Sequence, residues 1–204
     1  VIRGQNQTIP YPVASPSPSL PLSPLPNDRK ECSPNTLIQS REDLELPGYV
    51  DIVKVKSTLS GSVITVVIYL REIPDELTIN NRNVEENHLE MAWGIDIDAD
   101  NNPNTGDWGM IGEYKGFDFE LSAARWKSGE ERKGRLNDLF DTQTSIWRMS
   151  KNIDNGHWEV NQADNSLSLT GNIEGIKTNS YITIFAFARD AEGSPVEDII
   201  CSKE

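Results

Sequence analysis

The sequence predicts an all-β fold, an antiparallel β-sandwich of the jelly-roll or immunoglobulin-like kind that follows an extended, proline-rich N-terminal arm. From residue 49 onward, short runs of β-branched and aromatic residues alternate with turns rich in Gly, Asn and Asp. Helix signals are scarce, and the best of them covers only residues 131–140. Many short strands with regular turn signals are typical of a sandwich. The 204 residues are enough for one such domain and an appendage.

The N-terminal stretch is unsuited to building a core. Eight of the twelve prolines of the chain fall between Pro10 and Pro34, where they alternate with Ser and Leu. Because proline fixes φ and lacks a backbone donor, residues 10–26 are predicted to be extended and polyproline-II-like, with a reach of about 50 Å. We therefore assign residues 1–47 to an extended arm or linker and residues 48–204 to the folded domain.

The first strands of the domain are predicted at residues 50–57 and 62–70, which a turn at Gly61 joins as a hairpin. The clearest signal follows at residues 88–98, where apolar and polar residues alternate. One face carries Leu89, Met91, Trp93, Ile95 and Ile97, and the other carries His88, Glu90, Ala92, Gly94, Asp96 and Asp98. This alternation predicts a half-buried strand with one face on the core.

Residues 116–126 alternate in the same way, with Phe117 and Phe119 opposite Asp118 and Glu120. The remaining strands are predicted at residues 145–150, 157–162, 166–171, 181–189 and 197–202.

Charge and hydropathy exclude two kinds of partner. The 19 basic and 32 acidic residues give a formal net charge of −13, which repels phosphate backbones, so no nucleic acid is expected. The longest apolar run, residues 62–70, is about half of the roughly 20 residues that a helix needs to cross a bilayer, so no membrane span is expected. The chain starts without an initiator Met, and its surplus of Asn, Ser and Thr is typical of exported proteins. We expect a processed chain, secreted or at the cell surface, whose signal peptide has been removed.

Two cysteines, Cys32 and Cys201, lie near opposite ends of the chain. A bridge between them would tie the start of the folded part to its last strand and close a loop of about 168 residues, which stabilises by roughly 4–5 kcal/mol in the chain-entropy model. Two separate thiols in a reducing compartment are the alternative, and the sequence leaves it open.

The most informative stretch is the acidic turn DIDADNNPNTG at residues 96–106. Asp98, Asp100 and Asn102 alternate as the preceding strand ends, so three oxygen-bearing side chains can turn toward one point. Calcium takes roughly 6–8 oxygen ligands, and such a turn supplies several of them. Pro103 stands where an EF-hand needs glycine, so the pattern is not an EF-hand. A metal-free turn held by Asx-type hydrogen bonds is the alternative.

The acidic turn and the next strand resemble a known family. The turn reads D-x-D-x-N-x-x-T-G at residues 98–106, and G-x-D-F follows at residues 116–119. This combination is similar to the family 9 carbohydrate-binding modules and the DOMON-like superfamily of extracellular β-sandwiches, over residues 48–202. The resemblance implies a sandwich fold, a structural calcium ion at the acidic turn, and a non-catalytic binding or anchoring role.

Transferred to this chain, the resemblance implies calcium ligands from both segments. They are Asp98, Asp100 and Asn102, a backbone carbonyl at Asn104 or Thr105, and Asp118 from the next strand. Asp96, Asp107 and Glu113 are acids in reserve. Clustered carboxylates without a counter-ion would repel one another, so we expect either a metal ion or a nearby Arg.

Aromatic residues bear on a carbohydrate-binding role. Trp93 is expected in the core because it lies on the apolar face of its strand, and Trp147 and Trp158 are expected to follow it. The candidate platforms for stacking on a sugar ring, with packing over the loop as the alternative, are Trp108, Tyr114 and Trp126.

No catalytic pattern stands out in the sequence. It has no G-x-S-x-G, phosphate loop or dinucleotide fingerprint, and His88 and His157 have no nucleophile or metal-ligand partner at a recognisable spacing. Haem ligation by a histidine together with Met91, Met110 or Met149 is not expected. We expect a non-enzymatic structural or adhesive module that self-associates through its arm, with other copies of itself or a cell-surface component as partner. A carbohydrate-binding module tethered by the arm, with a polysaccharide as partner, is the alternative.

Overall fold

The computed structural model describes residues 32–79, 88–109, 115–126, 132–136, 144–148, 151–189 and 193–201. Its fourteen elements within these residues are all strands, so the predicted all-β class is confirmed. In chain order they are β1 (Leu37–Gln39), β2 (Ile52–Ser60), β3 (Val63–Leu70), β4 (Leu77–Ile79), β5 (Leu89–Asp98), β6 (Asp107–Trp108), β7 (Lys115–Phe117), β8 (Phe119–Trp126), β9 (Arg132–Gly134), β10 (Thr144–Arg148), β11 (Lys151–Asn161), β12 (Ser166–Asn172), β13 (Tyr181–Arg189) and β14 (Pro195–Ile200). Within the described part of the chain, no helix is long and apolar enough to cross a membrane.

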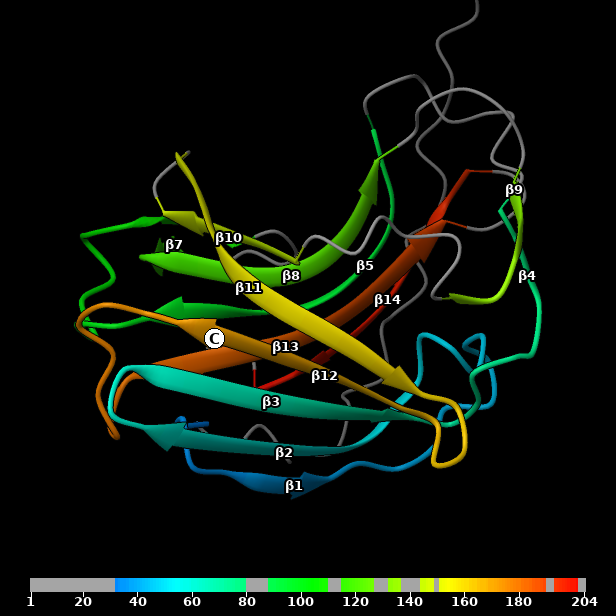
Figure 1. Ribbon diagram of the computed structural model, residues 1–204, viewed down its shortest axis with the longest axis horizontal. Helices are drawn as coiled ribbons and strands as arrows, with labels where there is room; N and C mark the ends of the chain where they lie inside the picture. The colour runs from blue at the N-terminus through cyan, green and yellow to red at the C-terminus, as the bar shows by residue number, and fades with distance from the viewer. Residues whose placement is uncertain are drawn as a thin grey trace, which may run out of the picture.

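Ten strands form one continuous antiparallel ladder that folds over at β11. The order is β1-β2-β3-β12-β11-β10-β8-β5-β13-β14. The first half of β11 pairs with β10, and its second half, residues 157–161, pairs with β12. The two halves of the ladder therefore stack as two layers, and Figure 1 shows β3 and β12 in front of β5 and β13. This arrangement is an antiparallel β-sandwich.

The main core lies between the two layers and is filled by the inward side chains of β3, β5, β12 and β13. The fully buried residues of these strands include Ile64, Val66, Ile68, Trp93, Ile95, Ile97, Leu167, Leu169, Ile182 and Ile184. The indole N–H of Trp93 donates to the carbonyl of Tyr49 at 2.8 Å, so its polar atom is satisfied inside the core. The predicted core positions of Trp93 and Trp158 are confirmed.

The prediction that residues 88–98 form a half-buried strand is wrong for β5, because all ten residues of this strand are buried. The second face of β5 contributes Ala92 to a smaller apolar cluster with Phe185 and Phe187. Gly94 pairs with Phe185 across the strands, and a Cβ at Gly94 would lie 2.7 Å from the Phe185 ring. The small residues of β5 therefore leave room for an aromatic side chain of β13 to cover the strand.

Other differences concern short elements. Strand β1 pairs with β2 although it lies within the range assigned to the arm, of which residues 1–31 are outside the described residues. The expected helix at residues 131–140 is wrong at residues 132–134, where β9 pairs with β4; residue 136 is helical, and residues 137–140 lie outside the described residues. Strands of two or three residues are too short for an alternating pattern to identify.

The two cysteines form a disulfide, which confirms the bridge that the sequence left open. Cys32 and Cys201 are 169 positions apart in the chain, and their Cα atoms are 5.5 Å apart. The bridge is held against β13: Ile182 N donates to the Cys32 carbonyl at 3.1 Å, and the Tyr181 hydroxyl donates to the Cys201 carbonyl. The start of the described chain is thus fastened to the end of β14.

Candidate metal centre

The acidic turn leaves the end of β5, and a backbone contact places the next strand beside it. Asp98 is the last residue of β5. Asp118 stands between β7 and β8, and its backbone N–H donates to the carbonyl of Ile97 at 2.8 Å. This bond brings Asp118 next to Asp98, although the two residues are twenty positions apart.

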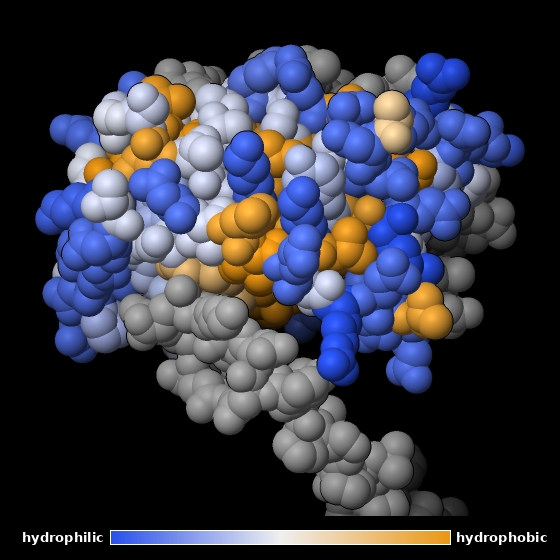
Figure 2. Space-filling model, turned by 90° about the horizontal axis from the view of Figure 1, so that it is seen from below, coloured by the Kyte–Doolittle hydropathy of each residue, from blue (hydrophilic) through white to orange (hydrophobic). Residues whose placement is uncertain are grey.

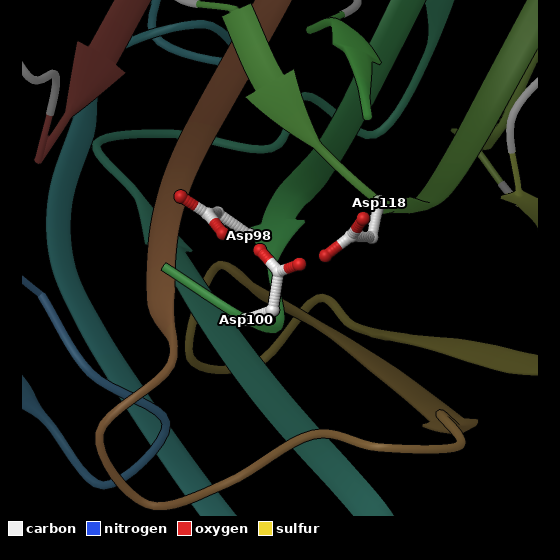
Figure 3. A group of neighbouring side chains, drawn as sticks. All are labelled: Asp98, Asp100 and Asp118. Carbon is white, nitrogen blue, oxygen red and sulfur yellow. The ribbon is translucent and has the colours of Figure 1, made fainter. Parts of the chain in front are cut away.

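Three carboxylates converge at this point. Asp98, Asp100 and Asp118 each offer an oxygen, and these oxygens all lie within 4.8 Å of one another. Asp98 is buried, Asp118 is half-buried and Asp100 is exposed, so the group opens toward solvent on one side. Figure 3 shows the carboxylates of Asp100 and Asp118 pointing toward each other, with Asp98 beside them. We call these three residues the aspartate trio.

Hydrogen bonds within the turn orient the trio. Ala99 N donates to Asp118 Oδ2 at 2.9 Å, and Asn102 N donates to Asp98 Oδ1 at 3.1 Å and to Asp100 Oδ1 at 2.9 Å. The hydroxyl of Thr105 donates to both carboxylate oxygens of Asp100 at 3.0 and 3.1 Å. These donors hold the carboxylates in place, and the oxygens that accept one bond, such as Asp118 Oδ2 and Asp98 Oδ1, have a second lone-pair direction for a cation.

The other predicted ligands lie in the same turn. Asn102 accepts a bond from Asn104 N at 3.1 Å through its side-chain oxygen, and its carbonyl accepts from Thr105 N at 3.1 Å. Asn102 and Thr105 therefore bond directly to the trio and Asn104 bonds to Asn102, with part of their oxygen lone pairs used to hold the turn. The resulting donor set consists of oxygen atoms, which suits a hard cation.

Two glycines explain why the turn and the following strand can approach so closely. Gly106 has φ +71°, and a Cβ there would lie 2.3 Å from the Phe117 carbonyl oxygen. Gly116 has φ +121°, and its Cβ would lie 2.7 Å from the Cα of Pro103. Only glycine fits such positions without displacing backbone. The T-G and G-x-D-F pieces of the motif are thus required by the packing that brings Asp118 to the turn.

The reserve acids lie in different surroundings. Asp96 is buried and lies directly across from Glu120 in the β5–β8 pair. A Cβ at Gly109 would lie 2.4 Å from Asp96 Oδ2, so the segment after β6 packs onto this carboxylate. Asp107 is exposed and accepts a bond from its neighbour's backbone N–H. Glu113 lies outside the described residues.

Of the candidate sugar platforms, Trp108 is the one whose side chain is described. It is 60% exposed, lies in β6 and pairs with Lys115 of β7. Tyr114 and the side chain of Trp126 lie outside the described residues. An indole held on a short strand beside the acidic turn is available for contact with a partner.

Sequence reasoning missed a group of buried and half-buried charged residues on β5 and β8, namely Glu90, Arg125 and Glu120. Glu90 and Arg125 form a buried ion pair with an N–O distance of 3.1 Å. Burial raises the pKa of Glu120 to about 7, an effect that the hydrogen bond from Ser122 only partly offsets. In a chain with 32 acidic residues, no sequence signal distinguishes these carboxylates from exposed ones.

Comparisons with protein-family models, with curated proteins and with solved structures find no match to this chain. A function for this protein is therefore inferred from the geometry of its own residues.

Proposed function

We propose that this protein is a secreted, calcium-stabilised β-sandwich without catalytic activity, which serves as a structural or adhesive unit and associates with other copies of itself through its N-terminal arm. The observation that carries the proposal is the convergence of three carboxylates, from the last residue of β5, the turn that follows it and the residue before β8. The resemblance of residues 98–106 and 116–119 to a family of non-catalytic extracellular β-sandwiches supports the same structural or adhesive role.

Calcium is the cation that this donor set favours. Asp98, Asp100 and Asp118 would hold the ion, with oxygens of Asn102, Asn104 and Thr105 completing its shell. Zinc and copper prefer nitrogen or sulfur ligands, and magnesium demands a nearly ideal octahedron of about six oxygens. Calcium accepts a larger and less regular oxygen shell, which an Asp- and Asn-rich turn provides.

The ion would fasten the turn to the start of β8. The trio places like charges within 4.8 Å of one another, and a divalent cation between them turns this repulsion into attraction. Since the site is assembled only when β5 and β8 pair, calcium binds the folded chain and stabilises it. The sandwich would therefore be most stable in a calcium-rich, extracellular medium.

Two further observations favour an extracellular location and a role outside the cell. The Cys32–Cys201 disulfide is typical of oxidising compartments. The formal net charge of −13 repels polyanions such as nucleic acids, which are abundant inside cells.

Charge favours the arm as the segment that joins one copy to another. Residues 1–31 carry three basic and two acidic residues, so their net charge is +1, whereas the rest of the chain is strongly negative. Two folded domains therefore repel each other, but an arm and a domain do not. Figure 2 shows a face on which apolar residues gather in the middle with polar residues around them, a pattern that marks interaction surfaces. Leu37 of the edge strand β1 is 65% exposed.

Replacement of the arm tests the association. The full chain is compared with a variant whose residues 1–30 are exchanged for a Gly/Ser sequence of equal length, which keeps the chain length and Cys32. Size-exclusion chromatography with light scattering, in calcium, is expected to show assemblies for the parent and monomers for the variant. Equal assembly of both chains would refute the role of the arm.

A second candidate function, carbohydrate binding, is favoured by Trp108. Its exposed indole offers an apolar face of the kind that stacks on sugar rings. In this case the arm would be a spacer between the domain and a larger structure. Polysaccharide pull-down or a glycan array should then show binding that Trp108→Ala abolishes, while the melting temperature changes little because the side chain is exposed. If the parent chain binds no glycan, this candidate function is excluded.

A further inference from the structure

Strand β14, at one end of the ladder, lies beside β2 near the other end, and the side chain of Asp198 bridges the two strands. We call this contact the seam. Strand β14 ends the ladder on one side, and β2 is next to the opposite end. Between them, Ile52 N donates to Asp198 Oδ2 at 2.7 Å. Ile52, the first residue of β2, is fully buried, and Asp198 of β14 is half-buried. A carboxylate thus supplies the acceptor that a strand carbonyl would supply in a closed barrel.

This carboxylate lies among like charges. Asp51 precedes Ile52 and is fully buried; its Oδ2 accepts bonds from Arg71 Nε at 2.7 Å and from Asp43 N at 3.0 Å. Its Oδ1 is buried, and among the described residues no hydrogen-bond partner reaches it. Arg71 pairs with Asp51, and the negative charges that act on Asp198 are those of Asp51 and Asp43.

The surroundings favour a proton on Asp198. Burial is the largest cause, and the negative charges of Asp51 and Asp43 add to it. Bonds from the backbone N–H groups of Ile52 and Ile199 act in the opposite direction but are weaker in sum, so the pKa of Asp198 is raised to about 6.

We propose that Asp198 is a proton-binding site that controls the seam between β2 and β14. The neutral carboxyl group still accepts the bond from Ile52 N–H through one oxygen, and it no longer repels Asp51 and Asp43. Protonation therefore tightens the seam, and ionisation loosens it. The neighbouring Cys32–Cys201 bridge holds the end of β14 in either state.

The sign of the pH dependence follows from linkage. An aspartate in the unfolded chain takes up its proton near a pKa of about 3.9, whereas Asp198 in the folded chain does so near 6. Between these values the folded state binds one more proton than the unfolded state. The contribution of Asp198 to stability is therefore gained as the pH falls through about 6 and lost as the pH rises through it.

The test uses the full chain at constant, saturating calcium, and compares it with Asp198→Asn, which keeps an oxygen for Ile52 N–H without the charge. At pH 7.5 the variant is expected to have the higher unfolding midpoint, and by pH 5 the difference should vanish. In the parent, the protection of the Ile52 amide against hydrogen exchange, corrected for the intrinsic rate, should rise about 10-fold from pH 7.5 to pH 5, because a pKa near 6 crosses this range. In the variant it should stay constant.

A lower midpoint for Asp198→Asn at pH 7.5 would overturn the proposal, because it would show that the ionised carboxylate stabilises the seam, for instance through a bound cation. Asp198→Ala serves as the second variant: it loses the bond to Ile52 and should be less stable than Asp198→Asn at both pH values. If neither variant folds, the carbon-13 chemical shift of the Asp198 carboxyl group in the parent decides: a midpoint near 6 supports the proposal, and one below 4.5 refutes it.

Discussion

Replacement of Asp118 by Asn should destabilise the protein in calcium and stabilise it without calcium. Asp118 is one of three carboxylates whose oxygens lie within 4.8 Å of one another, and its Oδ2 accepts a bond from Ala99 N at 2.9 Å. Asparagine keeps an oxygen for that bond but removes the negative charge. The substitution therefore separates the role of the carboxylate as a metal ligand from its role in the turn.

The magnitudes follow from Coulomb's law and from linkage. Two unit charges at this separation repel by about 1 kcal/mol in water, so neutralising Asp118 in EDTA should relieve about 1–2 kcal/mol from its two partners at low salt. In calcium at about 100 times its dissociation constant, binding stabilises the folded chain by about 2.7 kcal/mol. For a chain of this size that corresponds to a rise in Tm of about 5–10 °C, most of which the variant should lose.

Differential scanning calorimetry in EDTA and in millimolar calcium measures both effects. Glu174→Gln is the matched control, because this acid is exposed and lies outside the trio; its Tm should respond to calcium as the parent does. Equal Tm values for the parent in EDTA and in calcium would refute a structural calcium ion. An Asp118→Asn variant with the full calcium response would refute the assignment of this ligand.

Three further predictions concern the acidic turn, the disulfide and the buried ion pair. Gly106→Ala should cost about 1–3 kcal/mol in urea unfolding, because its Cβ would meet backbone at 2.3 Å, whereas Gly61→Ala, with nothing within 4 Å, should cost less. Breaking the disulfide by Cys201→Ser should lower the free energy of unfolding by about 3–5 kcal/mol, and reduction of the parent should have the same effect. Arg125→Met should cost about 3–5 kcal/mol because it removes one partner of the buried ion pair, and Glu90→Gln in the same chain should recover part of that loss in a double-mutant cycle.

Features that depend on residues close together in the chain, such as a strand or a turn, could be predicted from the sequence. The hairpin of β2 and β3, the strand β5 and the strand β13 appear at the predicted places, because several alternating apolar residues determine each of them. The convergence of Asp98 and Asp100 follows from their spacing at a strand end. The position of Asp118 beside them came from the resemblance, and the structure explains it through the register of β5 and β8.

Features that depend on distant parts of the chain could not be predicted. The second buried face of β5 is covered by Phe185, which lies about ninety positions later in the sequence. The ion pair of Glu90 with Arg125 and the contact of Ile52 with Asp198 each join residues that no local pattern relates. Pairing of the two cysteines was open for the same reason, since a sequence gives their spacing along the chain but not their separation in space.

The disulfide also determines how the domain would bear a mechanical load. Tension applied to the segments that flank the two cysteines enters the fold at Cys32 and leaves it at Cys201, and the sulfur–sulfur bond carries that force directly between them. The sandwich and its acidic turn, which lie between the cysteines in the chain, are bypassed by the pull. A series of such domains could be stretched without unfolding any of them, so that only the flanking segments lengthen.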